Sequence, residues 1–563
     1  MGYFWTILTL AVALGLSWRY LGGYMVGVFE GRITFLSFIE RPIYRLLGTS
    51  PDREQSWKRY AGSLVIFSAL SFAITYAILR LQGSLPLNPQ HFGAVGQGLS
   101  WNTAASFVTN TNWQNYGGET TLSYLSQMCA LTVQQFVTPA VGIGAALVIT
   151  RGFSKKGSPT IGNFWVDITR ALLYVLLPIA TLAGLVFVGQ GAIQTLAGPV
   201  TIHNALNGVS QTIALGPVGF MEAIKQLGTN GGGFFNINSA HPFENPTALT
   251  NWLSIYLLLV IPFSLTYVFG KMVGSLRQGV AIVTAMVILF GAWVAFASVA
   301  EHQPNPAVQQ AGLLHQPTGN TVGKEVRFGV PSSAIFGVSS TQTSTGSADS
   351  SYDSFTPIGG GALLTGMMMG EVTPGGVGSG LYTILIYAVI AVFIGGLMVG
   401  RTPEYLGKKI QATEVKLAGL GTLVMPMIVL IITGIAVSIH AGRAGPLNSG
   451  PHGFTEILYA LTSQGNNNGS AFAGLSGNTT FYNVIGGVDM LIGRFGIMIP
   501  AIALGGVLAG KNVVAAGAGT FRTDNPMFIG LLIGVIIIVG GLTFFPAVSL
   551  GPIVEQLSHG TFF

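Results

Sequence analysis

Charged side chains are scarce in this sequence. Lys and Arg number 25 and Asp and Glu 19, which together make 8% of 563 residues, whereas about 25% is usual for a soluble globular protein. So few charges cannot cover a water-facing surface, which excludes a soluble multidomain enzyme and an intrinsically disordered chain. The net charge of +6 does not form the basic stripe of a nucleic-acid-binding protein either, so no nucleic acid is expected as a partner.

Cysteines and phosphate-binding segments are missing as well. The single Cys129 lies in an apolar run, so the chain has neither a disulfide framework nor a cysteine-based metal site. No Asp-Lys-Thr-Gly segment occurs. The nearest approach to a phosphate loop ends at Gly510-Lys511, which is followed by Asn512 instead of the Ser or Thr that would hold magnesium. The sequence therefore predicts no bound nucleotide, and energy must come from a partner or an ion gradient.

Apolar runs are what the sequence has in abundance. A helix needs about 20 mostly apolar residues to cross a bilayer, and this length predicts an all-α integral membrane protein with ten spans. The spans are expected near 3–27, 60–82, 121–150, 168–190, 248–270, 279–300, 377–400, 415–440, 483–510 and 526–548.

The positive charges orient these spans. If the spans alternate, most Lys and Arg fall in the connections 28–59, 151–167, 271–278, 401–416 and 511–525. The opposite connections are much longer but contain only Lys225, Lys324, Arg327 and Arg443. Basic connections stay on the cytoplasmic side of a membrane, so both termini are predicted to face outward. The alternative, for any single basic cluster, is an ordinary solvated loop.

Four outer connections each contain a short run of Thr, Ser, Asn and Gly. These four polar runs are 109–112 (Thr-Asn-Thr-Asn), 228–231 (Gly-Thr-Asn-Gly), 343–346 (Thr-Ser-Thr-Gly) and 466–469 (Asn-Asn-Asn-Gly). Each follows a stretch too short to span a membrane, expected as half-helices over 100–108, 218–227, 331–340 and 454–463. Four similar units in one chain indicate an array, so four span, pore loop, span repeats are predicted in a pseudo-fourfold arrangement.

The repeat divides the chain into six parts. They are an extra N-terminal span with a cytoplasmic linker (1–59), pore repeats over 60–150, 151–270, 271–400 and 401–510, and an extra C-terminal span (511–563).

Irregular polar backbone at membrane depth is tolerated only where it lines a water-filled cavity. The four runs are therefore expected to meet on one axis, where main-chain carbonyls can replace the hydration shell of a monovalent cation. Gly ends three of the runs, and Asn112 ends the first; both residue types tolerate left-handed backbone. The alternative is that each run is a simple turn. The predicted filter residues are Thr109, Asn110, Thr111, Asn112, Gln114, Gly228, Thr229, Asn230, Gly231, Gly232, Thr343, Ser344, Thr345, Gly346, Asn466, Asn467, Asn468 and Gly469.

At these residues the sequence resembles the KdpA family, the potassium-binding subunits of bacterial Kdp potassium-transporting ATPases, within a superfamily that includes Trk, Ktr and HKT. The segments 109–119 (Thr-Asn-Thr-Asn-Trp-Gln-Asn-Tyr-Gly-Gly-Glu) and 228–246, which begins Gly-Thr-Asn-Gly-Gly-Gly-Phe-Phe, carry the resemblance. The resemblance implies a potassium-selective filter, K+ as the transported ion and a location in the bacterial inner membrane. It also implies partners: a P-type ATPase subunit that hydrolyses ATP, a small single-span subunit and a periplasm-exposed accessory subunit.

Two ionisable residues within the predicted membrane region are candidates for a gate or translocation path. Arg494 lies near the middle of the ninth span, and Glu371 lies in a Gly-rich, Pro-containing segment before the seventh. The alternatives are a structural pair of Arg494 with Asp489 or another carboxylate, and an outer linker around Glu371.

Further polar residues lie in the outer connections. Carboxylates after the runs could concentrate cations at the outer mouth, although each alone is typical of a solvated loop: Glu119, Glu244, Asp349 and Asp353. The histidines have no paired spacing typical of a metal site. Lys225, close to the second run, has no clear role and is expected to point to the outer vestibule.

Two rival functions remain at this point. A self-sufficient potassium symporter or channel would carry the same loops, although two extra spans favour a subunit that docks on others. A polytopic membrane enzyme would need clustered titratable groups at one depth, and only Arg494, Asp489 and Glu371 are available.

Overall fold

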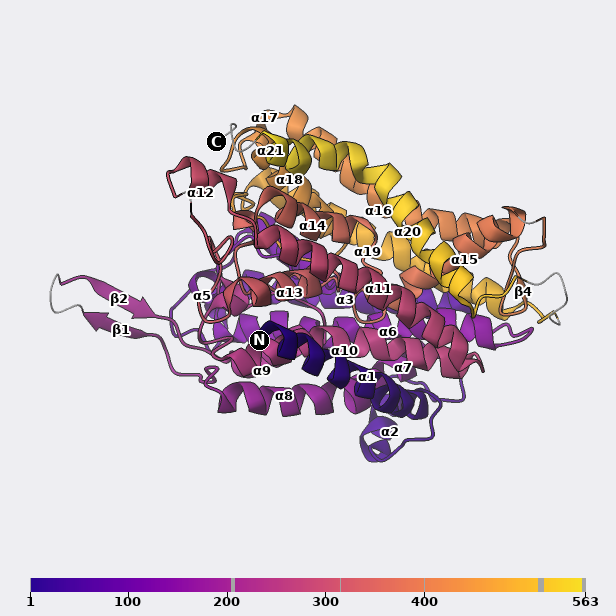
Figure 1. The fold of residues 1–563 in the computed structure, drawn as a ribbon. Coiled ribbons are helices and arrows are strands. Elements are labelled where there is room, and N and C mark those ends of the chain that lie inside the picture. The colour runs from indigo at the N-terminus through magenta and orange to yellow at the C-terminus, as the bar shows by residue number, and fades with distance from the viewer. Residues whose placement is uncertain (1, 204–207, 314, 399, 515–520, 559–563) are drawn as a thin grey trace.

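The computed structural model describes residues 2–203, 208–313, 315–398, 400–514 and 521–558, and the chain is built mainly from helices (Figure 1). Within these residues, ten helical segments are long and apolar enough to cross a membrane, which confirms the expected number. Their main helices are α1 (Gly2–Phe29), α3 (Trp57–Leu81), α6 (Val133–Ser154), α8 (Leu177–Gly189), α10 (Ala248–Met272), α11 (Leu276–Glu301), α15 (Ser379–Met398), α16 (Ala412–Ser438), α19 (Thr480–Ala509) and α20 (Pro526–Val548).

Some spans are extended by shorter helical elements. The third span begins with a π-helical segment, η2 (Ser126–Thr132). The fourth consists of α7 (Phe164–Arg170), a second π-helical segment, η3 (Ala171–Leu176), and α8. The tenth continues into η6 (Ser549–Ile553) and α21 (Val554–Leu557).

Four half-helices stand where the sequence predicts them. They are α4 (Gln97–Val108), α9 (Gly219–Leu227), α13 (Gly329–Thr341) and α18 (Gly450–Gly465). At 1.5 Å per residue none of them is long enough to cross a bilayer. Each is followed by a polar run and then by a span, although the third unit inserts α14 (Pro357–Met368) before α15.

The two ends of the helical bundle differ (Figure 1). The hairpin of β1 (Val200–His203) and β2 (Ser210–Ile213) projects from one end, near α12 (Pro306–Gln310), and α1 begins and α21 ends toward that same end. The opposite end carries α2 (Ser37–Leu46) and the short hairpin of β3 (Glu404–Tyr405) and β4 (Lys408–Lys409). The remaining short elements are η1 (Gln82–Ser84), α5 (Gly118–Thr121), η4 (Asn238–Ala240), η5 (Tyr352–Ser354) and α17 (His440–Arg443).

Burial separates inner from outer helices. In the most apolar window of α6 and of α10, 83% of residues are buried, whereas the corresponding window of α1 has 6%. Small residues let the inner helices approach closely: a methyl group added at Gly152 of α6 would lie 2.6 Å from the Cα atom of Gly505 in α19. The outer helices leave apolar side chains exposed, which suits contact with lipid rather than water.

Candidate ion-binding site

The first three polar runs lie side by side. The side-chain amide of Asn110, in the first run, donates a hydrogen bond of 2.9 Å to the carbonyl oxygen of Thr229 in the second. In the second run, Gly231 packs so closely on the main chain of Thr345 in the third that an added methyl group would overlap it. Residues more than 100 positions apart are therefore in direct contact.

The fourth run closes the circle. The amide of Asn468 donates to the carbonyl oxygen of Thr341 at the end of α13, over 3.2 Å, and a methyl group on Gly346 would lie 2.6 Å from the main chain of Gly469. On its other side, the amide of Asn467 donates to the hydroxyl of Thr111, over 3.1 Å. The four runs thus form a continuous ring, in which each contacts the next and the last contacts the first.

Every run has the same alternating backbone conformation. Its second and fourth residues have positive φ angles, and its first and third residues do not. Alternation of left- and right-handed residues turns successive peptide groups toward the same side, so that their dipoles are aligned. The left-handed residues are Asn110 and Asn112, Thr229 and Gly231, Ser344 and Gly346, and Asn467 and Gly469.

The half-helices end at this ring. Their C-terminal caps are Thr109, Gly228, Gln342 and Asn466, which belong to or directly precede the four runs. The C-terminus of a helix carries a partial negative charge, so four such ends are directed toward one place. The runs are almost entirely buried, and low local polarity strengthens this effect.

Several of the predicted filter residues make contacts that support the ring. Gln114 joins the chain after the first run to that after the second, because its side chain both donates to the carbonyl oxygen of Gly233 and accepts from its amide, at 3.1 and 3.0 Å. Gly232 lies against Asn112: a methyl group added to Gly232 would lie 3.0 Å from the Cβ atom of Asn112. Asn466 donates its amide back to the carbonyl oxygen of Thr462, over 2.9 Å.

Glu371 lies directly beside the third and fourth runs. Its carboxylate accepts a hydrogen bond of 2.8 Å from the amide of Asn468 and another from the hydroxyl of Ser344. The segment around it separates α14 from α15 and is buried, so Glu371 belongs to the interior and not to an outer linker.

Arg494 shares a small cavity with Glu371. The cavity, of about 20 Å³, also borders Ser344 and Asn467 at one face of the ring. Asp489 is buried but accepts no hydrogen bond from the described residues, and the ion pairs found among those residues include none between it and Arg494. The alternative, a structural pair of Arg494 with Asp489, is therefore not formed within the described part of the chain.

Two of the four carboxylates expected at an outer mouth are not in contact with solvent. Glu244 is fully buried and pairs with Lys225, whose ammonium lies 2.7 Å from it. Asp349 is also fully buried and accepts a hydrogen bond from Asn251. The prediction of a vestibule position for Lys225 is wrong, because this side chain has no exposed surface. Glu119 and Asp353 remain partly exposed.

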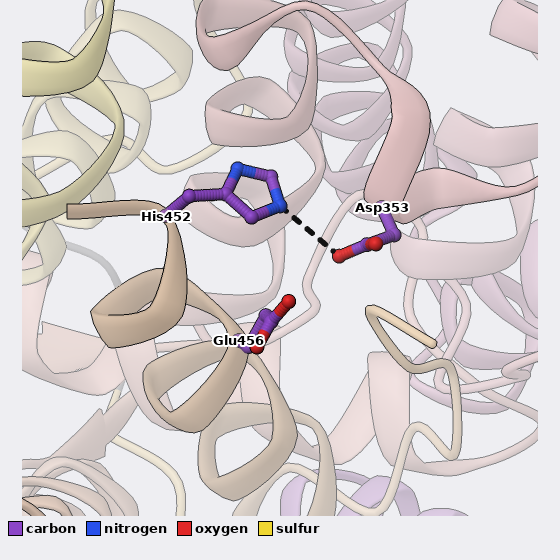
Figure 2. A group of neighbouring side chains, drawn as sticks. All are labelled: Asp353, His452 and Glu456. Atoms are coloured by element: carbon purple, nitrogen blue, oxygen red, sulfur yellow. Dashed lines mark hydrogen bonds and ion pairs between the residues drawn. The ribbon is translucent and has the colours of Figure 1, made fainter. Parts of the chain in front are cut away.

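A histidine between carboxylates lies in the first turn of the fourth half-helix, α18 (Figure 2). Asp353, His452 and Glu456 offer ligand atoms within 4.8 Å of one another, a grouping that sequence spacing did not predict. His452 Nε2 lies 3.2 Å from Asp353, and Nδ1 lies 2.9 Å from Glu555. Burial opposes its protonation, but these two hydrogen bonds and charges raise the pKa of His452 to about 10. A doubly protonated ring has no lone pair for a metal, so the geometry favours an ion-pair cluster.

The fold is that of a multi-pass membrane protein. It is similar to the structure of the potassium transporter TrkH from Vibrio parahaemolyticus, with a TM-score of 0.50 over 87% of this chain and 96% of that one, at 14% sequence identity. At this identity the likeness shows the fold alone.

The family model for KdpA, described as the potassium-transporting ATPase A subunit, matches residues 7–557. Similar proteins include one from Methylobacterium nodulans, 56% identical over 98% of this chain and 97% of its own length, and one from Mesorhizobium japonicum, 55% identical over 99% of both. Both are named potassium-transporting ATPase potassium-binding subunit. The chain belongs to the KdpA family.

Proposed function

We propose that this chain binds potassium within the ring and passes it into the membrane, as the potassium-binding subunit of an ATP-driven uptake complex. The relatives are named for potassium binding and for the ATPase that they belong to, which fits ATP hydrolysis by a separate partner. The observation that carries the proposal is the positive φ at the second and fourth residue of all four runs. Four independent turns would have no physical reason to share one backbone conformation.

The carbonyl oxygens of the ring replace the water around the ion. A potassium ion that leaves water must find oxygens already in place, and a ring closed by contacts between runs supplies them without further rearrangement. The ends of four half-helices add negative potential. Together these features favour a cation over an anion, and the fixed backbone favours one ionic size.

Glu371 and Arg494 act on the inner side of the ring. The guanidinium of Arg494 borders the cavity next to the ring, where its positive charge repels a cation and prevents free leakage. Glu371 bonds to Asn468 and Ser344 in two runs at once, so a movement of its segment alters the ring directly. This pair is the proposed gate.

The orientation follows from the positive charges of the connections. In this proposal the end of the bundle with β1 and β2 faces the periplasm, and the chain resides in the bacterial inner membrane. Both termini are proposed to face the periplasm too, although residues 1 and 559–563 lie outside the described part of the chain. Four pore repeats with one extra span at each end form the proposed domain organisation. The proposed partners are a P-type ATPase subunit, a small single-span subunit and a periplasm-exposed accessory subunit.

Rubidium tests the proposal, because it resembles potassium in size and scatters X-rays anomalously. Crystals or cryo-EM samples of the assembled complex would be prepared in rubidium chloride and, as a control, in sodium chloride. An ion peak on the ring axis in rubidium alone is expected. A rubidium peak elsewhere in the chain, with none at the ring, would contradict the proposal.

A further inference from the structure

Lys225 is a fully buried ammonium behind the second run. It lies in half-helix α9, and its side chain has 0% exposure. The Nζ atom contacts Glu222 and Glu244, and it donates hydrogen bonds of 2.9 Å to both Asn238 Oδ1 and Ser239 Oγ. Burying one cation with two carboxylates is costly unless each group is satisfied by partners, and here four oxygens surround a group with three protons.

The cluster reaches the ring through one side chain. Asn238 accepts from Lys225 with its amide oxygen and donates from its amide nitrogen to the carbonyl oxygen of Gly231, over 2.6 Å. An amide can be turned either way round in principle, but the ammonium fixes the oxygen toward Lys225 and therefore the nitrogen toward Gly231. An amide polarised by a cation is also a stronger donor.

The same cluster holds the chain beyond the third run. The hydroxyl of Ser347 lies 3.1 Å from Asn238 Oδ1 and accepts a hydrogen bond of 2.8 Å from Gln226, the neighbour of Lys225. The cluster therefore links Gly231, the last residue of the second run, to Ser347, which directly follows the third run.

Within the described residues, no equivalent hydrogen bond holds the fourth residue of another run. Among the hydrogen bonds of the described residues, none runs from a side chain to the carbonyl oxygen of Asn112, Gly346 or Gly469, the fourth residues of the other runs. The fourfold similarity of the ring is thus broken at Gly231, where a charged cluster holds one peptide group.

We infer that Lys225 is a positioning residue for the ion site: through Asn238 it fixes the peptide group that follows Gly231 and thereby sets the affinity and size preference of the ring. The ammonium does not touch the ion. The inference rests on the proposed function of the ring.

Two variants separate this role from a merely structural one. Lys225→Met removes the ammonium at similar volume, whereas Asn238→Gly leaves the ion pairs of Lys225 with Glu222 and Glu244 in place and removes the side chain that links the ammonium to Gly231 and to Ser347. Glycine also tolerates the positive φ of Asn238, which is 54°. Lys324→Met is the matched control, because Lys324 is a buried lysine paired with Glu301 at 2.8 Å with no contact to a run among its described bonds.

The measurement is ATPase stimulation of the assembled complex by potassium and by rubidium, with the thermal midpoint of each variant. We expect Lys225→Met and Asn238→Gly to raise the potassium concentration for half-maximal stimulation about tenfold, as for a lost charge-assisted hydrogen bond. The half-maximal concentrations of potassium and rubidium should also become more similar to each other. Lys324→Met should lower the thermal midpoint while the ratio of the two ions stays unchanged.

Unchanged affinity and ion ratio in an assembled Asn238→Gly complex would overturn the inference, and this variant decides the matter if Lys225→Met does not assemble. A Gly231→Asp variant keeps the two proposals distinguishable. If it alters selectivity while Asn238→Gly and Lys225→Met do not, only the positioning role fails. If Gly231→Asp itself has no effect, the second run is not part of the ion site.

Discussion

Gly469 lies against the main-chain carbonyl of Thr111, so that a methyl group added to the glycine would overlap the oxygen. These residues belong to the fourth and the first run, and their contact closes the ring. The ring therefore depends on the absence of a side chain at Gly469, where the fourth run meets the first. Its geometry is a property of the whole chain and not of any single loop.

Substitution of this glycine should damage the ring without a general loss of stability. Gly469→Ala introduces the overlap with Thr111 and also strains a backbone with a φ angle of 100°. We expect the potassium affinity of the assembled complex to fall at least tenfold, measured by potassium-stimulated ATPase activity.

Gly312→Ala is the control for backbone strain. Its φ angle is 101°, yet nothing lies within 4 Å of the added methyl group. Both variants carry a strain of about 1 to 3 kcal/mol, so a loss of affinity in both alike would attribute the effect to strain and not to the contact with Thr111.

A carboxylate in the second run should change which ions are accepted. Gly231→Asp places a negative charge against the main chain of Thr345, where it distorts the carbonyl positions and attracts cations regardless of size. We expect weaker discrimination between potassium and smaller or larger cations, measured by ATPase stimulation with potassium, sodium, rubidium and ammonium. Unaltered affinity and selectivity would remove the second run from the site.

The sequence alone predicts the spans and half-helices because both depend on local composition. Ten apolar stretches of bilayer length and four short stretches before polar runs require no knowledge of tertiary contacts. The left-handed fourth residues could also be expected, since three are glycine and one is asparagine. Of the left-handed second residues, only Asn110 and Asn467 could be expected on the same ground. Thr229 and Ser344 rarely adopt a positive φ on their own, and neighbouring runs impose it on them here.

Contacts between side chains that are distant in sequence cannot be predicted from the sequence either. Lys225 and Glu244 are 19 residues apart, and His452 and Asp353 are 99 residues apart. No spacing rule connects such pairs, because the turn of the chain that joins them is set by packing. Glu244 and Asp349 were accordingly expected at the surface, whereas both are buried.

Arg494 is buried and Arg151 is nearly so, but the two should respond differently to substitution. Arg151 donates two hydrogen bonds to Asp167, at 2.6 and 2.8 Å, so Arg151→Ala leaves a buried charge unpaired and should cost about 3 to 5 kcal/mol of stability. Arg494 borders the cavity beside the ring. Arg494→Ala should therefore leave assembly intact and increase passive potassium flux, measured with proteoliposomes of the complex.

Arg494→Lys, which keeps the positive charge, should restore most of the barrier to passive flux. Loss of the assembled complex in Arg494→Ala, to the extent seen in Arg151→Ala, would indicate that Arg494 is a structural residue.

The cluster around His452 predicts a particular dependence on pH. Its hydrogen bonds to Asp353 and Glu555 raise the pKa of His452 to about 10 against the opposing effect of burial. The ordinary value is about 6.5, so the stabilisation is complete below that pH and is lost as the pH rises toward 10. The difference in thermal midpoint between the natural protein and His452→Gln should shrink over this interval.

His241 supplies the control, because burial and the charge of Arg327 lower its pKa to about 4. It is neutral in the folded protein above pH 6.5, so His241→Gln should produce a difference that stays constant between pH 6.5 and 10. The same measurements decide between an ion-pair cluster and a metal site. A chelator that lowers the midpoint of the natural protein but not that of His452→Gln would identify a metal, since carboxylates that pair with an imidazolium need none.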